Sequence, residues 1–253
     1  MGLKILYEDF KRWRLLDLEF PEDPWFNMAV EEAISLHVGK GDVLPTLRFW
    51  RNKNAVVIGY FQSVKDVVNM PLVKKLGIAI IRRFSGGGAV YQDLGNLNFA
   101  FSILRNSNLI PVNILKSYEK FCSGVILGLK KMEFKAKFKP INDIIIGDKK
   151  VSGNAQARQK GFVLHHGTLM VDTNLDMLAA LRGLSTPVTT LMREKGEEKQ
   201  GLSLFLIKKM LCEGIEETLK ISLEPGRLFR GELETAKKLL EEKYGKEEFI
   251  FLR

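Results

Sequence analysis

A short loop with three consecutive glycines, Gly86 to Gly88, constrains this chain more than any other segment. The apolar, strand-like run 76–81 leads into it through Arg82 and Arg83. Glycines let a ligand lie directly against the backbone, and neighbouring guanidinium groups bind phosphoryl or carboxylate groups. The loop matches neither a P-loop nor Gly-x-Gly-x-x-Gly, since Tyr91 stands where the last glycine would fall. From this loop alone, an anion-binding site and a plain tight turn are equal alternatives.

The balance of charge and the two cysteines narrow the class of protein. Lysine plus arginine number 39 against 30 aspartate plus glutamate, a formal charge of +9 that favours an acidic partner. The basic residues are dispersed without a helix-turn-helix, zinc-finger or aromatic RNA-binding signature, so we expect no nucleic-acid partner. Cys122 and Cys212 lie in separate apolar runs and are expected to be buried thiols. Neither a secretory signal nor a run of about 18 apolar residues occurs, which predicts a cytoplasmic protein without a membrane span.

Helical and strand-like patterns follow one another along the chain without an internal repeat. The apolar spacing predicts helices at 27–38, with Asn27 as the N-cap, at 71–77, at 112–132, at 175–182 behind an Asn174 cap, at 203–219 and at 232–244. Buried strands are expected at 55–60, 78–82, 98–104, 144–146, 162–164 and 167–171, and a mobile loop at 183–200. We therefore predict an α+β fold with a mixed, largely antiparallel sheet flanked by helices, formed by residues 1–253 as a single domain.

Two further polar clusters adjoin predicted strands. One runs from Asn142 and Asp143 through 150–156, and the other spans 165–169. In an extended chain the polar residues at 150, 152, 154 and 156 face one side, while small residues between them leave room for a ligand on the other. At most one of His165 and His166 can face inward from a strand. Each cluster alone could be a solvated lysine or a capped turn, but three clusters at strand ends predict one site built from adjacent strands.

Taken together, these motifs resemble the signature of lipoate–protein ligases. The matching runs are Arg-Arg-x-Ser-Gly-Gly-Gly-Ala-Val at 82–90, Asp-Leu-Gly-Asn at 93–96, Asn-Asp at 142–143, Lys-Val-Ser-Gly at 150–153 and His-Gly-Thr-Leu at 166–169, in that order. The resemblance extends from about residue 17 to residue 172. It implies the fold of the biotin/lipoate–protein ligase catalytic domain. It also implies two reactions, in which lipoate and ATP form lipoyl-AMP and the lipoyl group then passes to a lysine of an acceptor domain.

The resemblance also implies roles for individual residues. Lys150 would be the catalytic cation, Arg83 would hold the phosphate side, Asn142 would read the adenine, and Asp143 would hold Mg²⁺ or the nucleotide. The remaining residues expected to bind substrate or nucleotide are Ser85, Gly86, Gly87, Gly88, Ala89, Val90, Tyr91, Ser152, Gly153, His166, Gly167 and Thr168. The acceptor lysine supplies the nucleophile, so no Ser-His-Asp set is expected, and no general base is assigned. The loop 183–200 would close over the adenylate as a lid.

Partners and alternatives follow from the same resemblance. The expected acceptor is a lipoyl domain of a 2-oxoacid dehydrogenase complex or of a glycine cleavage carrier protein, and a basic rim would speed encounter with such acidic domains. Single-chain ligases carry a C-terminal accessory domain, which this chain is expected to lack, so a separate accessory subunit is expected.

Two other functions compete with the ligase. An ATP-independent octanoyl or lipoyl transferase would need a cysteine shortly before the Lys-x-x-Gly run, and 134–141 contains none. The other is a non-catalytic protein that binds acyl-adenylate or a carrier. Biotin is a poorer substrate candidate, because the Gly-Arg-Gly-Arg loop of biotin ligases is missing from the sequence.

Overall fold

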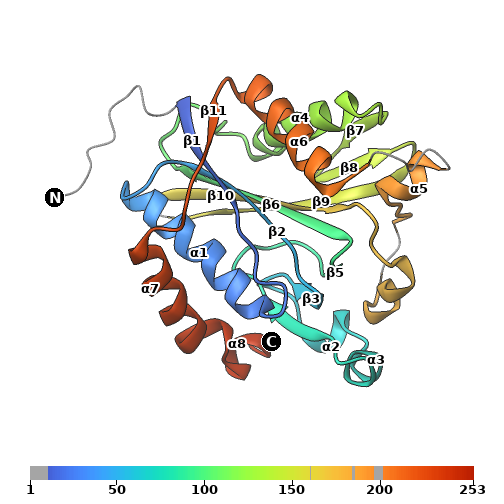
Figure 1. Ribbon diagram of the computed structural model, residues 1–253. Coiled ribbons are helices and arrows are strands. Elements are labelled where there is room, and N and C mark those ends of the chain that lie inside the picture. Colours follow the sequence, from blue (N-terminus) through green and yellow to red (C-terminus); the bar gives the residue numbers. More distant parts are fainter. Residues whose placement is uncertain (1–10, 160, 184–185, 197–201) are drawn as a thin grey trace.

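The computed structural model describes residues 11–159, 161–183, 186–196 and 202–253, and its architecture is α+β. The main sheet has eight strands (Figure 1), in the order β11 (Ser222–Pro225), β1 (Arg12–Asp17), β2 (Thr46–Trp50), β6 (Asn96–Leu104), β10 (Phe162–Met170), β9 (Lys149–Arg158), β8 (Asp143–Ile146) and β7 (Ala136–Lys139). β1 is parallel to both of its neighbours, and the other pairs in this sheet are antiparallel. The predicted mixed, largely antiparallel sheet is confirmed.

A second sheet of three strands carries the segment that leads into the glycine loop. Its order is β4 (Ala79–Arg82), β3 (Asn54–Ile58) and β5 (Val90–Asp93). β3 is parallel to β4 and antiparallel to β5. The short helices α2 (Val64–Val67) and α3 (Met70–Lys75) and a 3₁₀ helix at Leu175–Ala180 pack against it. The Asn174 cap is confirmed, since its side chain accepts from the Asp176 N–H, although the helix is 3₁₀ rather than α.

Helices cover both faces of the main sheet (Figure 1). On one face lies α1 (Pro24–Lys40), against which α7 (Arg230–Leu239) and a π-helical turn at Leu240–Tyr244 pack, while α8 (Glu247–Ile250) lies against β4 of the small sheet. On the other lie α4 (Ile114–Lys131) and α6 (Leu204–Leu219). Alternation along β6 serves both cores, because Phe99 and Phe101 face α4 while Ala100 faces α1. No described helix is long and apolar enough to cross a bilayer.

Three local predictions are corrected. α1 begins earlier than expected, because the Asp23 side chain accepts from the Phe26 N–H and Pro24 occupies the first turn, while Asn27 is buried inside the helix. The runs 162–164 and 167–171 belong to one strand, β10. Gly167 does not break it but lies in its interior, where an added Cβ would come within 2.3 Å of the Phe99 ring. Within the predicted loop 183–200, α5 (Leu191–Lys195) is helical, and residues 184–185 and 197–200 lie outside the described residues.

Arg82 and Arg83 point in opposite directions because β4 alternates. The Arg82 guanidinium is buried and donates to the Phe249 and Ile250 carbonyl oxygens of α8. It also donates to carbonyl oxygens of the segment between β3 and α2, including Gln62 O at 2.6 Å. Arg82 therefore ties the C-terminal helix to the small sheet and leaves Arg83 to face the interior.

Candidate active site

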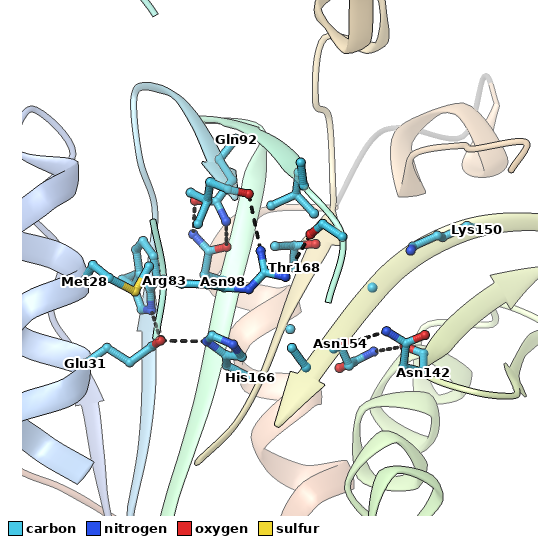
Figure 2. A pocket seen from close by; sticks show the side chains of 18 residues that line it. Met28, Glu31, Arg83, Gln92, Asn98, Asn142, Lys150, Asn154, His166 and Thr168 are labelled. Atoms are coloured by element: carbon cyan, nitrogen blue, oxygen red, sulfur yellow. Dashed lines mark hydrogen bonds and ion pairs between the residues drawn. The ribbon is translucent and has the colours of Figure 1, made fainter. Parts of the chain in front are cut away.

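A cavity with about 560 Å³ of empty volume, counting its open mouth, lies between α1, the glycine loop and the strands β9 and β10 (Figure 2). Ten of the residues predicted from the sequence line it: Arg83, Gly88, Ala89, Val90, Asn142, Lys150, Gly153, His166, Gly167 and Thr168. Eight lining residues were not predicted as site residues: Met28, Glu31, Trp50, Val57, Gln92, Asn98, Asn154 and Ala155. The three polar clusters of the sequence thus meet at one cavity.

Six predicted residues do not line this cavity. Ser85 is buried behind its wall, and Gly86 and Gly87 form the loop around the Arg83 side chain. Tyr91 faces the core of the small sheet, where burial raises its pKa to about 12. Ser152 is buried on the opposite face of β9, and Asp143 stands beside the cavity in an ion pair with Lys150.

The Arg83 side chain holds the glycine loop in shape. Its Nη2 donates to the Gly86 and Gly88 carbonyl oxygens at 2.7 and 2.8 Å, and its Nε donates to Ser85 Oγ at 3.1 Å. Burial lowers the pKa of Arg83 to about 10, so the guanidinium stays charged at neutral pH. Gly87 has φ +92°, and a Cβ there would lie 2.9 Å from Arg83 Nη2. Glycine is therefore required where the loop wraps the guanidinium.

A β-bulge turns Lys150 into the cavity. Ile144 pairs with Ser152 but the next residue of β8, Ile145, pairs with Lys150, so Val151 is the extra residue of β9. The bulge moves Lys150 onto the face that carries Gly153, whereas simple alternation put it on the face of Ser152. Val151 is fully buried in the core beneath α4. The predicted common face of the polar residues 150–156 is therefore wrong at Lys150, while the small residues do leave the room that was expected.

Lys150 is held from two sides. Its Nζ lies 2.7 Å from Asp143 Oδ1, and its side chain remains 25% exposed, so the ammonium can still reach a ligand. Its backbone pairs with the segment before α5, through Pro187 O at 2.8 Å and Thr189 N at 2.9 Å. Part of the predicted lid is thus already hydrogen-bonded beside Lys150.

Asn142 is bound across the same pair of strands. Its Nδ2 donates to the Asn154 carbonyl oxygen, and its own carbonyl oxygen accepts from the Asn154 side chain and backbone N–H. These bonds fix the start of β8 against β9 and place the Asn142 side chain at the Lys150 end of the cavity (Figure 2).

A buried polar chain lies at the other end of the cavity (Figure 2). His166 Nδ1 is 2.7 Å from Glu31 Oε1, His166 Nε2 is 2.6 Å from Ser85 Oγ, and Trp50 Nε1 donates to Glu31. A serine–histidine–carboxylate set was not expected from the sequence. Its hydroxyl belongs to Ser85, which is 1% exposed and does not line the cavity, so the oxygen is not presented to a substrate. A carboxylate pair, Glu31 and Glu32, inside the buried face of a helix was the available signal for Glu31.

His165 and the cysteines lie away from the cavity wall. His165 faces Phe121 and Tyr118 beneath α4, where burial lowers its pKa to about 3. Both cysteines are free thiols, and neither lines the cavity. Burial raises the pKa of the Cys212 thiol to about 12 and that of the Cys122 thiol still further. The prediction that at most one of the two histidines faces inward is wrong, because helices cover both faces of β10 and both side chains are buried; only His166 lines the cavity. The raised pKa values keep both thiols protonated at neutral pH.

Protein ligands for a metal ion are few. Across the described ranges, no three His, Cys, Asp or Glu side chains are grouped so that they could hold an ion. Asp143 offers one carboxylate beside the cavity, which fits Mg²⁺ because that ion takes most of its ligands from phosphate and water.

Comparisons with known proteins agree on one family. The family model of the lipoyl protein ligase A/B catalytic domain matches residues 23–201. The chain is 34% identical to lipoate-protein ligase A subunit 1 of Thermoplasma acidophilum over 256 residues, which covers 93% of this chain and 95% of that protein. It is also 29% identical to octanoyltransferase LipM of Symbiobacterium thermophilum over 266 residues, covering 92% and 96% of the two chains.

Solved structures extend this similarity to the whole fold. The bipartite lipoate protein ligase of Thermoplasma acidophilum, described together with its E2 lipoyl domain, superposes with a TM-score of 0.85 at 32% identity over 96% of this chain and 97% of that one. A lipoate-protein ligase A crystallised with ATP gives a TM-score of 0.86 at 34% identity, over 95% and 98%.

Proposed function

This chain belongs to the lipoyl protein ligase A/B catalytic-domain family, and from that premise we propose that it is a cytoplasmic lipoate–protein ligase whose residues 1–253 form a single catalytic domain. It forms lipoyl-AMP from lipoate and ATP and transfers the lipoyl group to a lysine of a lipoyl acceptor domain. The observation that carries the proposal is Lys150, aimed by the bulge into a cavity whose wall has no thiol.

Lys150 serves both reactions. The lipoate carboxylate attacks the α-phosphate of ATP and pyrophosphate leaves; the ε-amino group of the acceptor lysine then attacks the acyl carbon and AMP leaves. Negative charge builds first on the phosphate oxygens and then on the acyl oxygen, and one fixed ammonium group beside both atoms stabilises both transition states. The ion pair with Asp143 at 2.7 Å keeps the Lys150 ammonium in place.

The rest of the cavity divides between nucleotide and acyl chain. Gly88, Ala89 and Val90 offer backbone along the nucleotide, in a loop shaped by Arg83. Asp143 would hold Mg²⁺, which neutralises phosphate charge when bound. The acyl chain runs away from Lys150 towards the end of the cavity that Met28 marks in Figure 2. Trp50 and Val57 also line the cavity and belong to the same buried apolar cluster as Met28.

The partners proposed are an acceptor domain and an accessory subunit. A lipoyl domain of a 2-oxoacid dehydrogenase complex or of a glycine cleavage carrier protein supplies the acceptor lysine. A separate accessory subunit supports activation, by analogy with lipoate-protein ligase A subunit 1 and the bipartite lipoate protein ligase of Thermoplasma acidophilum, to which almost the whole of this chain is similar.

One further function has a specific observation in its favour. The similarity to octanoyltransferase LipM, at 29% identity, is consistent with ATP-independent acyl transfer between carriers. A transferase of this kind would need a cysteine nucleophile in the site. The two thiols of this chain are both outside the cavity wall. The ligase is therefore the function that the site supports best.

The test bypasses activation by supplying preformed lipoyl-adenylate. The chain, the adenylate and a lipoyl acceptor domain are mixed, and the mass of the acceptor is followed over time. We expect Lys150→Ala to slow transfer by about 10²–10³-fold, the usual cost of losing one such donor. Lys149→Ala is the matched control, because the neighbouring side chain is 54% exposed and, among the described residues, makes one long ion pair of 3.9 Å with Glu194.

Two results would overturn the ligase. If transfer proceeds only at the uncatalysed rate, the chain does not catalyse the second half-reaction and the ligase proposal is wrong. Rapid transfer from an octanoyl thioester carrier without ATP would instead establish the transferase.

A further inference from the structure

A chain of buried hydrogen bonds runs from α1 to the cavity wall. Arg48 Nη2 donates to Asn27 Oδ1 at 2.6 Å, and Asn27 Nδ2 donates to Asn52 Oδ1 at 2.9 Å. Asn52 Nδ2 donates to Gln92 Oε1 at 2.8 Å, and Gln92 Nε2 donates to Asn98 Oδ1 at 2.8 Å. None of the five side chains belongs to a residue more than 3% exposed, and Gln92 and Asn98 line the cavity (Figure 2).

The guanidinium of Arg48 sets the direction of this chain. A guanidinium has donors only, so Asn27 must turn its oxygen towards Arg48 and its nitrogen away. The backbone agrees, because Asn27 Oδ1 also accepts from Phe20 N, and Asn27 Nδ2 also donates to the carbonyl oxygens of Phe20 and Arg51. In the structure each following amide accepts from the one before it. The orientation of the last two amides is therefore decided by a buried charge on another strand.

The last two amides can offer only N–H groups to a ligand. Gln92 Oε1 accepts from Asn52 at 2.8 Å and from Asn98 at 3.4 Å, while Asn98 Oδ1 accepts from Gln92 at 2.8 Å and from Asn96 at 3.0 Å. A carbonyl oxygen has two lone pairs, so both oxygens are saturated. Each amide nitrogen carries two hydrogens, and these bonds within the described residues use one of each. The inner wall of the cavity thus contains a pair of amide donors.

We propose that Gln92 and Asn98 select an acyl chain that carries hydrogen-bond-accepting sulfur near its far end over a plain hydrocarbon chain of the same length. The inference rests on the proposed function, and it names lipoate rather than octanoate as the acid that this site takes. Figure 2 shows both amides on the side of Met28 and Glu31, with Lys150 across the cavity. An acyl chain whose carboxyl end lies at Lys150 extends towards them.

The selection comes from the cost of burying unpaired donors. A hydrocarbon tail displaces water from the two amides and offers their N–H groups no hydrogen-bond acceptor, whereas a sulfur atom is a weak acceptor for them. An apolar wall alone distinguishes such tails poorly, because tails of similar size gain similar burial. Leaving one buried donor unsatisfied corresponds to roughly a tenfold difference in affinity.

The test measures calorimetric dissociation constants of lipoate and octanoate for the full chain. Free-acid binding needs neither the acceptor nor an activating subunit. We expect the chain to bind lipoate roughly tenfold more tightly than octanoate. Gln92→Met removes the donors at similar size, so it should weaken lipoate, strengthen octanoate and bring the ratio near one. Asn98→Leu should act in the same direction and serves if the first variant does not fold.

Met28→Leu is the matched control, because it exchanges one apolar wall residue for another and should change both affinities by the same factor. Equal affinity for the two acids, or an affinity ratio that both donor variants leave unchanged, would refute the proposal that Gln92 and Asn98 select the acyl chain. Neither result would contradict the proposed ligase function. Binding of neither acid at millimolar concentration would overturn the proposed function together with this inference.

Discussion

Replacing Gly153 by alanine should displace the Lys150 ammonium and slow the reaction, although Lys150 itself is unchanged. A Cβ on Gly153 would lie 2.7 Å from Lys150 Nζ and 2.8 Å from Lys150 Cε, where ordinary contacts begin at 3.4 Å. The contacted atoms are the far end of a flexible side chain, so the ammonium rather than the backbone is displaced, away from its place beside Asp143. The displacement needed is about 1 Å, and a misplacement of that size typically costs ~10²-fold in rate.

The same substitution should leave the free energy of unfolding unchanged or raise it. Gly153 is not among the residues with positive φ, so its backbone accepts alanine without strain. Glycine-to-alanine replacement at a compatible position stabilises a protein by about 0.4–1 kcal/mol, because the unfolded chain loses conformational freedom. Gly153→Ala is therefore expected to lower the transfer rate by ~10²-fold while the chain unfolds at the same or a higher urea concentration.

A double-mutant cycle identifies the cause. Transfer from preformed lipoyl-adenylate is measured for Gly153→Ala, for Lys150→Ala and for the double variant. If alanine at 153 acts through the ammonium, the double variant equals Lys150→Ala, since the group it displaces is already gone. Independent, multiplying losses would refute the argument, and so would an unchanged rate in Gly153→Ala.

Three further predictions follow from burial and packing. Removing both thiols with Cys122→Ala and Cys212→Ala should leave transfer within about threefold, because neither lines the cavity; a loss of transfer in the assay would favour a thiol mechanism. His165 has its pKa lowered to about 3 by burial, so the unfolded chain binds one more proton between about pH 6.5 and 3, and stability is present above that window and falls as pH drops through it. His165→Asn should flatten the pH dependence of urea unfolding by about 1.4 kcal/mol per pH unit there, and an unchanged slope contradicts the burial. Gly214→Ala places a Cβ 2.3 Å from Gly128 N where α6 crosses α4, and should lower unfolding free energy by about 1–3 kcal/mol; a smaller loss would mean that the helices are not so close.

The glycine loop and the arginine before it could be predicted from the sequence, because their sequence signals lie within a few residues of one another. Three glycines after an arginine and a buried strand specify a backbone turn and an adjacent cation within a few residues. The Arg83 guanidinium does lie inside that turn, bound to Gly86 and Gly88. The family resemblance rests on such runs, and the family match and the sheet both agree with it.

The rest of the cavity wall could not be predicted from the sequence, because its residues come from distant parts of the chain. Glu31 reaches His166 across 135 positions, from a helix whose other buried residues are mostly apolar. The sequence presents Gln92 and Asn98 as ordinary polar residues near a strand. Only the chain of hydrogen bonds from Arg48 through Asn27 and Asn52 gives their amides a direction. Such contacts depend on which strands become neighbours, and no short pattern encodes that.

The amino-acid sequence by itself determined the class of fold, the family, the glycine loop and the three polar clusters, because periodicity and turn chemistry act over a few residues. Only the tertiary structure decided which way the side chains point. The single extra residue Val151, forced into the core beneath α4, rotates Lys150 from one face of β9 to the other. Burial of a strand fixes its register, and one inserted residue reverses every side chain beyond it, so the position of the Lys150 ammonium is a property of packing.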